Sequence, residues 1–186
     1  MVEIRLLGGF RVTVDGAEVE DWPSLRAAQL VQLLSLAPGR RLPREQVIDT
    51  LWPELEPEAG GANLRKAAHH ARHALGRPEA VVLQGGQVAL FPSAEIDVDA
   101  ARFEAAAEAA LARKDAQACA AAAARYGGEL LPGAPYEAWT DAARTRLRSR
   151  YLALLRTSAQ WEALAQAEPT DEPAHRELMR RELAAG

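Results

Sequence analysis

The sequence predicts an α+β domain followed by an all-α domain, and three observations support this. Apolar and polar residues alternate at the start of the chain, in Val2, Ile4 and Leu6, which is the pattern of a half-buried strand. Three segments with helical periodicity then precede two short strand-like runs joined by Gly85-Gly86. From Asp99 onward, alanine-rich helical segments follow one another without a convincing strand. Mixed structure therefore comes first and helices come after it.

Bulk composition limits the class of protein. The chain has 186 residues, of which 48% are hydrophobic and 26% charged, as is typical of a soluble globular protein with one or two domains. No apolar run approaches the roughly 18 residues of a membrane span, and no signal-peptide pattern opens the chain. Cys119 is the single cysteine and cannot form an internal disulfide. We therefore expect a cytoplasmic protein that makes no membrane contact.

Charge is segregated along the chain although the net charge is only −4. Acidic residues cluster at 18–21, 54–58 and 95–99, whereas residues 61–77 contain basic side chains and no acidic ones. The net acidity argues against a protein coated in nucleic acid. It leaves room for a local DNA-binding surface, because backbone affinity depends on the charges at the contact.

The N-terminal segment predicts a small antiparallel sheet of three or four strands. A second alternating run at 10–14 follows the break at Gly8-Gly9. Asp15-Gly16 is a tight-hairpin signal, and residues 17–19 would return as a third short strand.

Two helices are predicted next. The first spans residues 25–36, with Ser24 as its N-cap and Pro38-Gly39 after its end. The second spans residues 44–52 and is stopped by Pro53.

A third, basic helix is predicted from Ala62 to Gly76, because Gly60-Gly61 would weaken a first turn placed earlier. Gly76 suits a left-handed C-cap. One narrow stripe of this helix is apolar: Leu64, Ala68, Ala71 and Leu75. The opposite face is basic and polar: Arg65, Lys66, His69, His70, Arg72 and His73. Such a helix packs on a small domain and offers its outer face to phosphates, although a solvated surface helix has the same pattern.

Residues 80–83 and 87–91 are predicted to form a β-hairpin around Gln84-Gly85-Gly86. The order is then a sheet, three helices and a hairpin. This is the layout of a winged helix-turn-helix, in which two helices place a third across a DNA groove.

The second half predicts stacked helical hairpins of tetratricopeptide type, because small residues let helices approach closely. The expected helices span 100–113, 115–126, 136–163 and 172–184. Composition changes near residues 93–96. We therefore expect two domains: residues 1–94 as a winged-helix DNA-binding domain and residues 95–186 as a helical domain.

With both halves in view, the chain resembles the antibiotic-regulator (SARP) family of bacterial transcription activators. In that family an OmpR-type winged helix precedes a helical bacterial transcriptional activation domain. The match runs through LLGGFRVTVDG, LRAAQLVQLLSLAPGRRLPREQVIDTLWPE, ANLRKAAHHARHALG, VVLQGGQVAL, DVDAARFE and RYGGELLPGAPYEAW..AARTRLRSRYLALL. It covers nearly the whole chain.

Two segments depart from the family pattern. His69, His70 and His73 stand where the family's recognition helix usually carries hydroxyl or arginine side chains. In the family a helical hairpin precedes the helix that corresponds to residues 174–180 of this chain. The segment at this place, residues 157–169, is shorter than that hairpin, and the chain ends soon afterwards. We therefore expect either a fragment of a longer regulator, with a truncated activation domain, or a minimal member of the family.

The resemblance implies a site. It places the face from Arg65 to His73 in the major groove, with Arg65, Lys66, His70 and Arg72 as the best candidates for base or phosphate contact. We expect DNA backbone contacts at the starts of the first two helices and at the wing tip, from Arg26, Arg44, Gln84 and Gln87. The acidic loop beside Trp52 resembles the loop that meets RNA polymerase in OmpR-type activators. Its residues are Trp52, Glu54, Glu56 and Glu58, and a solvated connector is the alternative.

Metal binding and catalysis are not expected. His69 and His73 have the i, i+4 spacing of a zinc pair, but no third ligand is nearby. No phosphate-loop, GxGxxG or nucleophile-elbow pattern occurs, so we expect neither an enzyme nor a bound cofactor. One hypothesis remains for the histidines: DNA phosphate would favour their protonation, which would make binding depend on pH.

The predicted function is sequence-specific DNA binding as a transcriptional regulator, an activator of promoters with direct repeats. The expected partners are double-stranded DNA, RNA polymerase and a second copy of the chain, with the helical domain supporting a homodimer. The alternative is a protein-interaction or ligand-sensing module whose winged helix no longer binds DNA. Salt dependence of DNA binding distinguishes the two, because only a real backbone contact weakens steeply with salt.

Overall fold

In the computed structural model, which describes residues 1–185, the chain opens with a four-stranded sheet in the order β3-β2-β1-β7. Strands β1 (Val2–Arg5), β2 (Arg11–Val14) and β3 (Ala17–Glu18) pair antiparallel, which confirms the predicted sheet. Strand β7 (Ile96–Val98) was not predicted and pairs parallel with β1. It is only three residues long, and the free edge of β1 stabilises it.

Helices α1 (Leu25–Leu36) and α2 (Arg44–Leu51) lie where the sequence predicts them. The hydroxyl of Ser24 accepts a hydrogen bond from the backbone N–H of Ala27 at 3.2 Å, as an N-cap does. Trp52 follows α2 as its C-cap and donates its backbone N–H to the Ile48 carbonyl at 2.8 Å.

Helix α3 (Pro57–Ala74) begins five residues earlier than predicted, so the expected start at Ala62 was wrong. Pro57 suits the first turn because its missing N–H needs no partner there. Gly60 and Gly61 lie inside the helix and are buried. A Cβ at Gly60 would lie 2.3 Å from Cγ2 of Ile48, so the glycine permits a close crossing of α2 and α3. Packing here outweighs the low helix propensity of glycine.

The predicted wing is a three-stranded sheet in the order β4-β6-β5. Strands β5 (Val81–Gln84) and β6 (Gln87–Leu90) form the expected hairpin, and the short β4 (Arg41–Pro43), which was not predicted, pairs with β6. The wing and α2 are also joined directly, because the Arg44 N–H donates to the Gly86 carbonyl at 2.8 Å. The wing tip is therefore fixed beside the start of α2.

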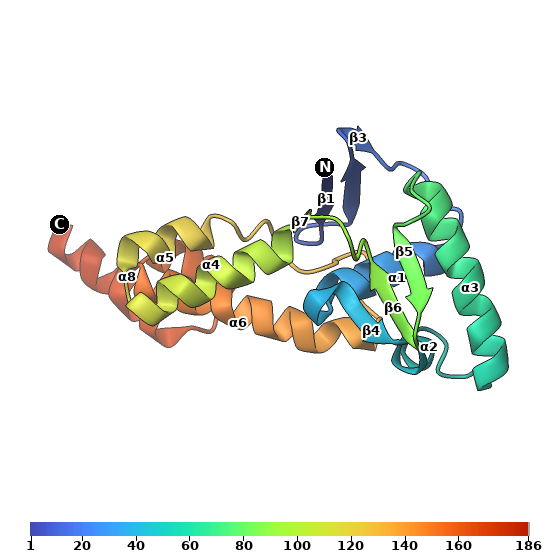
Figure 1. Cartoon of the computed structure of the whole chain (residues 1–186). Coiled ribbons are helices and arrows are strands. Elements are labelled where there is room, and N and C mark those ends of the chain that lie inside the picture. Colours follow the sequence, from blue (N-terminus) through green and yellow to red (C-terminus); the bar gives the residue numbers. More distant parts are fainter. Residues whose placement is uncertain (186) are drawn as a thin grey trace.

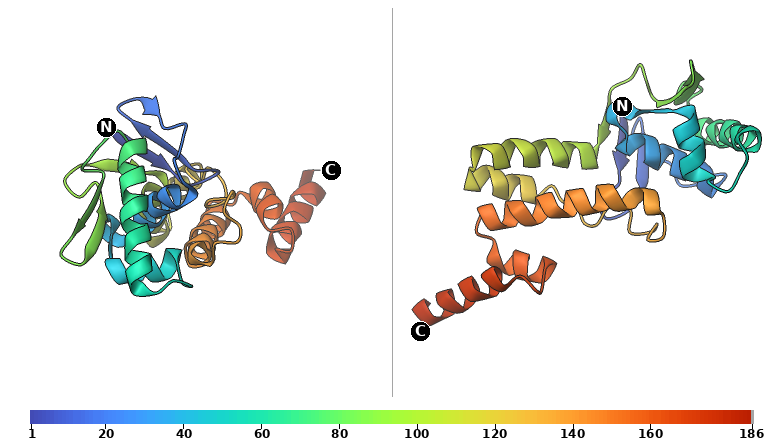
Figure 2. Two further views of the ribbon diagram at one scale, coloured as in Figure 1. Left: turned by 90° about the vertical axis from the view of Figure 1, so that its right-hand side faces the viewer. Right: turned by 90° about the horizontal axis from the view of Figure 1, so that it is seen from below.

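The second half is helical, in the order α4 (Asp99–Arg113), α5 (Ala116–Ala123), α6 (Asp141–Thr157), α7 (Trp161–Ala167) and α8 (Glu172–Ala185). In Figure 2, α4, α5 and α6 lie side by side, with α7 and α8 forming a separate hairpin. Phe103, Tyr126 and Tyr151 join the three helices, with the two tyrosine rings stacked at 4.3 Å.

The single helix expected at residues 136–163 is wrong. A 3₁₀ turn, η2 (Ala138–Thr140), precedes α6, and a short non-helical segment separates α6 from α7. The hydroxyls of Thr157 and Ser158 donate to backbone carbonyls four residues back, and Ala159 takes a positive φ of 55°. The backbone N–H groups of Ala159 and Gln160 donate to the carbonyls of Arg156 and Leu155 at 3.2 and 3.0 Å, which is a Schellman cap and ends the helix despite its continuous apolar pattern.

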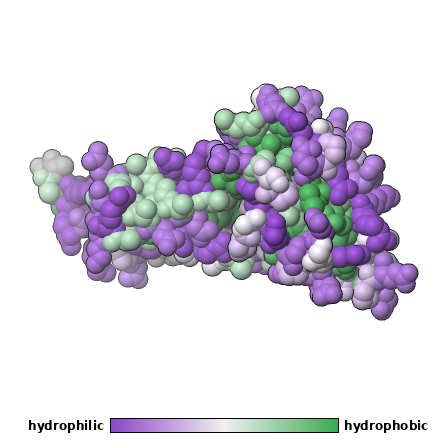
Figure 3. All heavy atoms as spheres, viewed as in Figure 1, coloured by the Kyte–Doolittle hydropathy of each residue, from purple (hydrophilic) through white to green (hydrophobic). Residues whose placement is uncertain are grey.

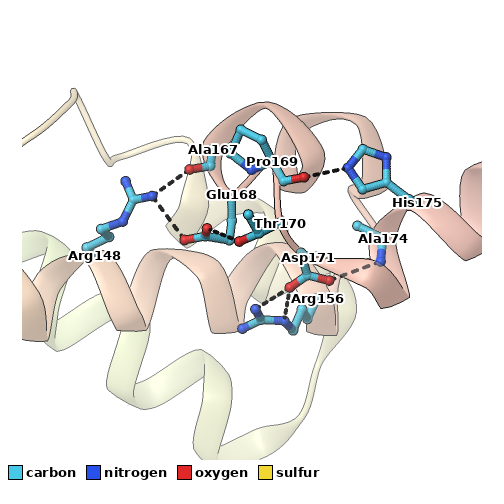
Figure 4. A network of polar contacts seen from close by, with 9 residues as sticks. All are labelled: Arg148, Arg156, Ala167, Glu168, Pro169, Thr170, Asp171, Ala174 and His175. Atoms are coloured by element: carbon cyan, nitrogen blue, oxygen red, sulfur yellow. Dashed lines mark hydrogen bonds and ion pairs between the residues drawn. The ribbon is translucent and has the colours of Figure 1, made fainter.

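A polar network fastens the last hairpin to α6 (Figure 4). Arg148 donates from Nη2 to the Ala167 carbonyl at 2.6 Å, and Arg156 pairs with Asp171. Asp171 also accepts the Ala174 N–H at 3.0 Å, which caps the start of α8. The hydrogen bond from Arg156 lowers the pKa of Asp171.

The two halves are joined by hydrogen bonds to the backbone of the residues that follow β1. The Asp99 carboxylate accepts the N–H groups of Leu6 and Leu7 at 2.8 and 3.1 Å. Burial raises the pKa of Asp99, and these N–H donors together with that of Ala100 oppose the rise. The Leu131 N–H donates to the Leu6 carbonyl at 2.9 Å.

The predicted division at residues 94 and 95 stays a prediction, and β7 pairs with β1 across it. Gly186, where the second predicted domain ends, lies outside the described residues. Within residues 1–185, no helix is both long enough and apolar enough to cross a membrane.

Candidate nucleic-acid interface

Helix α3 forms the outermost edge of the first half. In Figure 1 it lies at the end of the molecule opposite to α8, and in Figure 2 (left) it crosses the front of the molecule uncovered. Its inner stripe is the predicted one and is nearly inaccessible to solvent: Leu64, Ala68 and Ala71 at 0% and Leu75 at 3%. The helix therefore packs against the core through its narrow apolar stripe.

The outer face of α3 presents Arg65, Lys66, His69 and His73, all exposed. Hydrophilic side chains cover this edge of the molecule in Figure 3. Neither Arg65 nor Lys66 forms an ion pair with any residue in 1–185. Their charge is available to a partner outside the chain.

Two of the six predicted recognition residues are held by the fold. The Nδ1 atom of His70 lies 3.2 Å from the Ser24 hydroxyl, and the Nε–H of Arg72 donates to the Val81 carbonyl at 2.7 Å. Both side chains are half-buried. Arg72 thereby ties α3 to the wing strand β5, and His70 ties it to the start of α1. The freely exposed part of the face is narrower than the sequence suggested.

Arg44 and Arg65 converge over Gly61. A Cβ at Gly61 would lie 2.4 Å from Nη2 of Arg44 and 3.8 Å from Nη1 of Arg65. The glycine thus leaves the space in which the Arg44 guanidinium lies against α3. Neither guanidinium is paired with a carboxylate within the described chain. Two neighbouring unpaired guanidinium groups form a strong site for an anion such as phosphate.

Arg26 and Trp52 form a second unit. The Arg26 guanidinium carbon lies 5.9 Å from the centre of the Trp52 ring, and its Nη1 donates to Oε1 of Gln29 at 2.9 Å. Trp52 is only 6% exposed. The expectation that Trp52 presents a contact surface is therefore corrected: its ring belongs to the core and supports Arg26.

The wing contributes a shallow polar hollow of about 580 Å³. Gln84 and Gln87, paired across the hairpin tip, line it together with Arg41 of β4. Arg41 is exposed and was missed by sequence reasoning, because a strand as short as β4 has no alternating pattern to detect. The basic run Arg40-Arg41 was the available signal.

The acidic residues after α2 surround the start of α3. Glu54, Glu56 and Glu58 are all exposed. Glu58 lies in the first turn of α3, not in a loop as expected. A carboxylate at this position stabilises the helix through its dipole. The acidic segment and the basic face therefore occupy successive parts of one helix and its entry.

No three His, Cys, Asp or Glu side chains in residues 1–185 gather where they could hold a metal ion. The rings of His69 and His70 lie 5.9 Å apart and are tilted by 52°. Cys119 is buried, and burial raises the pKa of its thiol, which disfavours the thiolate.

Comparison with known proteins identifies the fold. No family model and no curated protein matches the chain. Among solved structures, the chain is similar to Mycobacterium tuberculosis EmbR in complex with a low-affinity phosphopeptide, with a TM-score of 0.70 and 21% sequence identity. The match covers 93% of this chain and 52% of that one, so the chain spans about half the length of the EmbR chain.

The likeness confirms the fold class expected from the sequence. The architecture is a winged helix-turn-helix followed by a tetratricopeptide-like helical domain.

Proposed function

We propose that the chain is a transcriptional regulator that binds double-stranded DNA with α3 in the major groove and the β5–β6 wing beside it. The observation that carries this proposal is a pair of guanidinium groups, Arg44 of α2 and Arg65 of α3, which converge over Gly61 and have no carboxylate partner in residues 1–185. A helix of 18 residues is about 27 Å long and can lie in the major groove, which admits an α-helix.

Each part of the surface has a distinct role in this arrangement. Arg65, Lys66, His69 and His73 face the groove, and Arg44 grips the phosphates at its edge. Arg72 and His70 act by fixing α3 against the wing and α1. Arg26, Arg41, Gln84 and Gln87 contact the DNA backbone on either side.

The finer elements of the proposal rest on the resemblance. Residues 1–94 act as the DNA-binding domain and the following residues as an activation domain in the cytoplasm. Two copies occupy a direct repeat, with the helical domain supporting the dimer. The exposed carboxylates Glu54, Glu56 and Glu58 meet RNA polymerase, because they flank the DNA-binding helix without covering its face.

The test is selection of bound sequences from random duplex DNA. We expect a direct repeat to be enriched by the wild-type chain and not by Arg65→Ala/Lys66→Ala. Arg113→Ala/Arg125→Ala removes the same charge from exposed positions of the helical half and should enrich the same repeat. If a folded wild-type chain enriches no sequence, the proposal fails and the protein-interaction module takes its place.

A further inference from the structure

A cavity of about 310 Å³ lies between α1 and the loop at residues 131–137, where the two halves meet. Its wall is largely apolar, with Phe10, Leu131 and Pro135 among its residues. Leu25 and Tyr136 also line it and are 70% and 96% exposed. Cavities of this size hold small organic molecules, and such large exposed apolar side chains suit a ligand that they would cover.

One wall of the cavity carries a carboxylate without a cation. Glu137 accepts hydrogen bonds from the Gln29 side-chain amide at 2.6 Å and the Trp139 indole N–H at 2.9 Å. It forms no ion pair with any of residues 1–185, and no Lys, Arg or His lines the cavity. Its carboxylate is therefore hydrogen-bonded by neutral donors only, and its charge is not balanced by a cation of the chain.

A second acceptor in the wall has no partner at all. Gln32 is 7% exposed, and its Oε1 makes no hydrogen bond within the described chain. A buried acceptor without a donor costs free energy. Because this oxygen has almost no accessible surface, Gln32 must rotate before a donor in the cavity can bond to it. An ammonium group could serve both residues, as the missing cation for Glu137 and as a donor for the Gln32 amide oxygen.

Another hollow, between the two halves of the chain, differs in this respect. It measures about 700 Å³ and lies between the end of α1, β7, α4 and α6. Its carboxylate, Glu104, is already paired with Arg146 at 2.7 Å and Arg150 at 3.2 Å. This carboxylate is therefore paired with cations within the chain, whereas Glu137 is not.

We propose that the smaller cavity binds a small molecule with an apolar body and a cationic amine. The ammonium group supplies up to three donors, which suit the Glu137 carboxylate and the Gln32 amide oxygen. The apolar body lies against Phe10, Leu131 and Pro135. The exposed Tyr136 ring then covers the ligand and loses its contact with water.

The cavity is joined to the candidate DNA surface by one side chain. Gln29 donates to Glu137 from Nε2 and accepts from Arg26 through Oε1 at 2.9 Å. An ammonium that draws Glu137 toward itself weakens the hold of Gln29 on Arg26, which contacts the DNA backbone in our proposed function. This coupling rests on that proposed function, whereas amine binding does not.

The experiment titrates the full chain with phenethylamine, with 2-phenylethanol as the neutral probe and phenylacetate as the anionic one. NMR signals of the Trp139 indole N–H and the Gln29 and Gln32 side-chain amides report occupancy. We expect saturable binding of the amine at least about tenfold tighter than of either other probe. Equal binding of the amine and the alcohol, or no shift with any probe up to about 10 mM, would overturn the proposal.

Variants separate a ligand site from a structural contact. Glu137→Gln keeps one acceptor oxygen and should weaken amine binding at least about tenfold, whereas Glu108→Gln on the exposed face of α4 should leave it unchanged. Gln32→Met removes the unpartnered acceptor, so we expect a higher Tm together with weaker amine binding. An unchanged amine affinity in both Glu137→Gln and Gln32→Met contradicts the site.

A blocking variant covers the case in which Glu137→Gln fails to fold. Gly133 lines the cavity, and a Cβ added there would meet nothing within 4 Å, so Gly133→Leu adds an apolar side chain at the cavity without a clash and without altering charge. It should abolish amine binding, and retained binding would overturn the proposal.

The coupling has its own test. Phenethylamine should change the DNA affinity of the wild-type chain and not of Glu137→Gln. An unchanged wild-type affinity overturns the coupling. Absence of all DNA binding overturns the proposed function, while the outcome of the amine titration stands.

Discussion

Helices α3 and α6 are both rich in basic side chains, and they use them in opposite ways. Every arginine of α6 pairs with a carboxylate of this chain: Arg144, Arg146, Arg148, Arg150 and Arg156. On α3, Arg65, Lys66 and Arg72 pair with none in residues 1–185. Arginine and lysine are more numerous on α6, yet the charge available to a partner is on α3.

The difference arises from what the fold brings near each helix. Helix α6 packs between α4 and the last hairpin, which supply Glu104 and Glu168. Helix α3 has apolar neighbours on its inner side, and its outer side is uncovered within the described chain. A basic helix can therefore bind an anionic partner only where the fold places no carboxylate of the same chain close enough to pair with its basic side chains.

The largest effect that tests this comparison is on DNA affinity. Arg65→Ala/Lys66→Ala removes two charge-assisted contacts of about 1.5 kcal/mol each, so Kd should rise roughly a hundredfold. The slope of log K against log salt should fall by nearly two. Arg146→Ala/Arg148→Ala removes the same charge from α6 and should leave both quantities unchanged. Fluorescence anisotropy with a labelled duplex at several salt concentrations measures them.

The inner side of α3 is tested by two neighbouring glycines. Gly60→Ala places a methyl group against the Ile48 side chain, so we expect a loss of about 1–3 kcal/mol in the free energy of unfolding. Gly61→Ala meets only the far end of the flexible Arg44 side chain, which can move away. There the better helix propensity of alanine should leave stability equal or raised by up to about 1 kcal/mol.

Urea denaturation followed by tryptophan fluorescence gives both values. Equal destabilisation by the two variants would contradict the prediction that the close contact between α2 and α3 requires glycine at position 60 but not at position 61. Gly61→Ala should also weaken DNA binding, because it displaces the Arg44 guanidinium from its place beside Arg65.

The ion pair between Arg156 of α6 and Asp171 predicts a loss of stability that occurs only at acidic pH. Arg156 lowers the pKa of Asp171 below its ordinary value of about 3.9. The ionised carboxylate therefore stabilises the fold above that ordinary value, and the contribution disappears as the pH falls through the lowered one. In thermal melts between about pH 2 and 6, Asp171→Asn should lose this part of the pH dependence. Glu79→Gln, at an exposed position that forms no ion pair within residues 1–185, should melt as the wild-type chain does at each pH.

The smallest expected effect concerns the histidines of α3. His69 and His73 are exposed on the basic face, where DNA phosphate favours their protonated forms. DNA affinity should therefore rise by about threefold to tenfold from pH 8 to pH 6. His69→Gln/His73→Gln should remove this dependence, whereas His175→Gln on α8 should keep it. A wild-type affinity that stays flat over this range contradicts the hypothesis.

Some side chains could be placed from the sequence because their neighbours lie within a few residues. The Ser24 cap, the span of α1 and the buried stripe of Leu64, Ala68 and Ala71 follow from local hydrogen bonding and helical periodicity. The hairpin around Gly85-Gly86 does too. The basic face of α3 was also predicted as a set, because its residues share one helix.

Other features could not be predicted because their partners are distant in sequence. Strand β7 exists only because β1 offers a free edge more than ninety residues earlier. Glycine at positions 60 and 61 weakens a helix in isolation, yet it leaves the space that Ile48 and Arg44 of α2 occupy. Gln29 and Glu137, 108 residues apart, meet only in the folded chain.

Local chemistry thus determined the order of the elements, their periodicity and the basic side of α3. Long-range packing decided which of those basic side chains stay unpaired, why Trp52 and Arg72 turn inward, and where a carboxylate and an amide oxygen share a cavity. The physical reason is the separation along the sequence between the residues that interact. Caps, turns and stripes depend on neighbours along the chain, whereas burial and charge pairing depend on which distant segments the fold brings into contact.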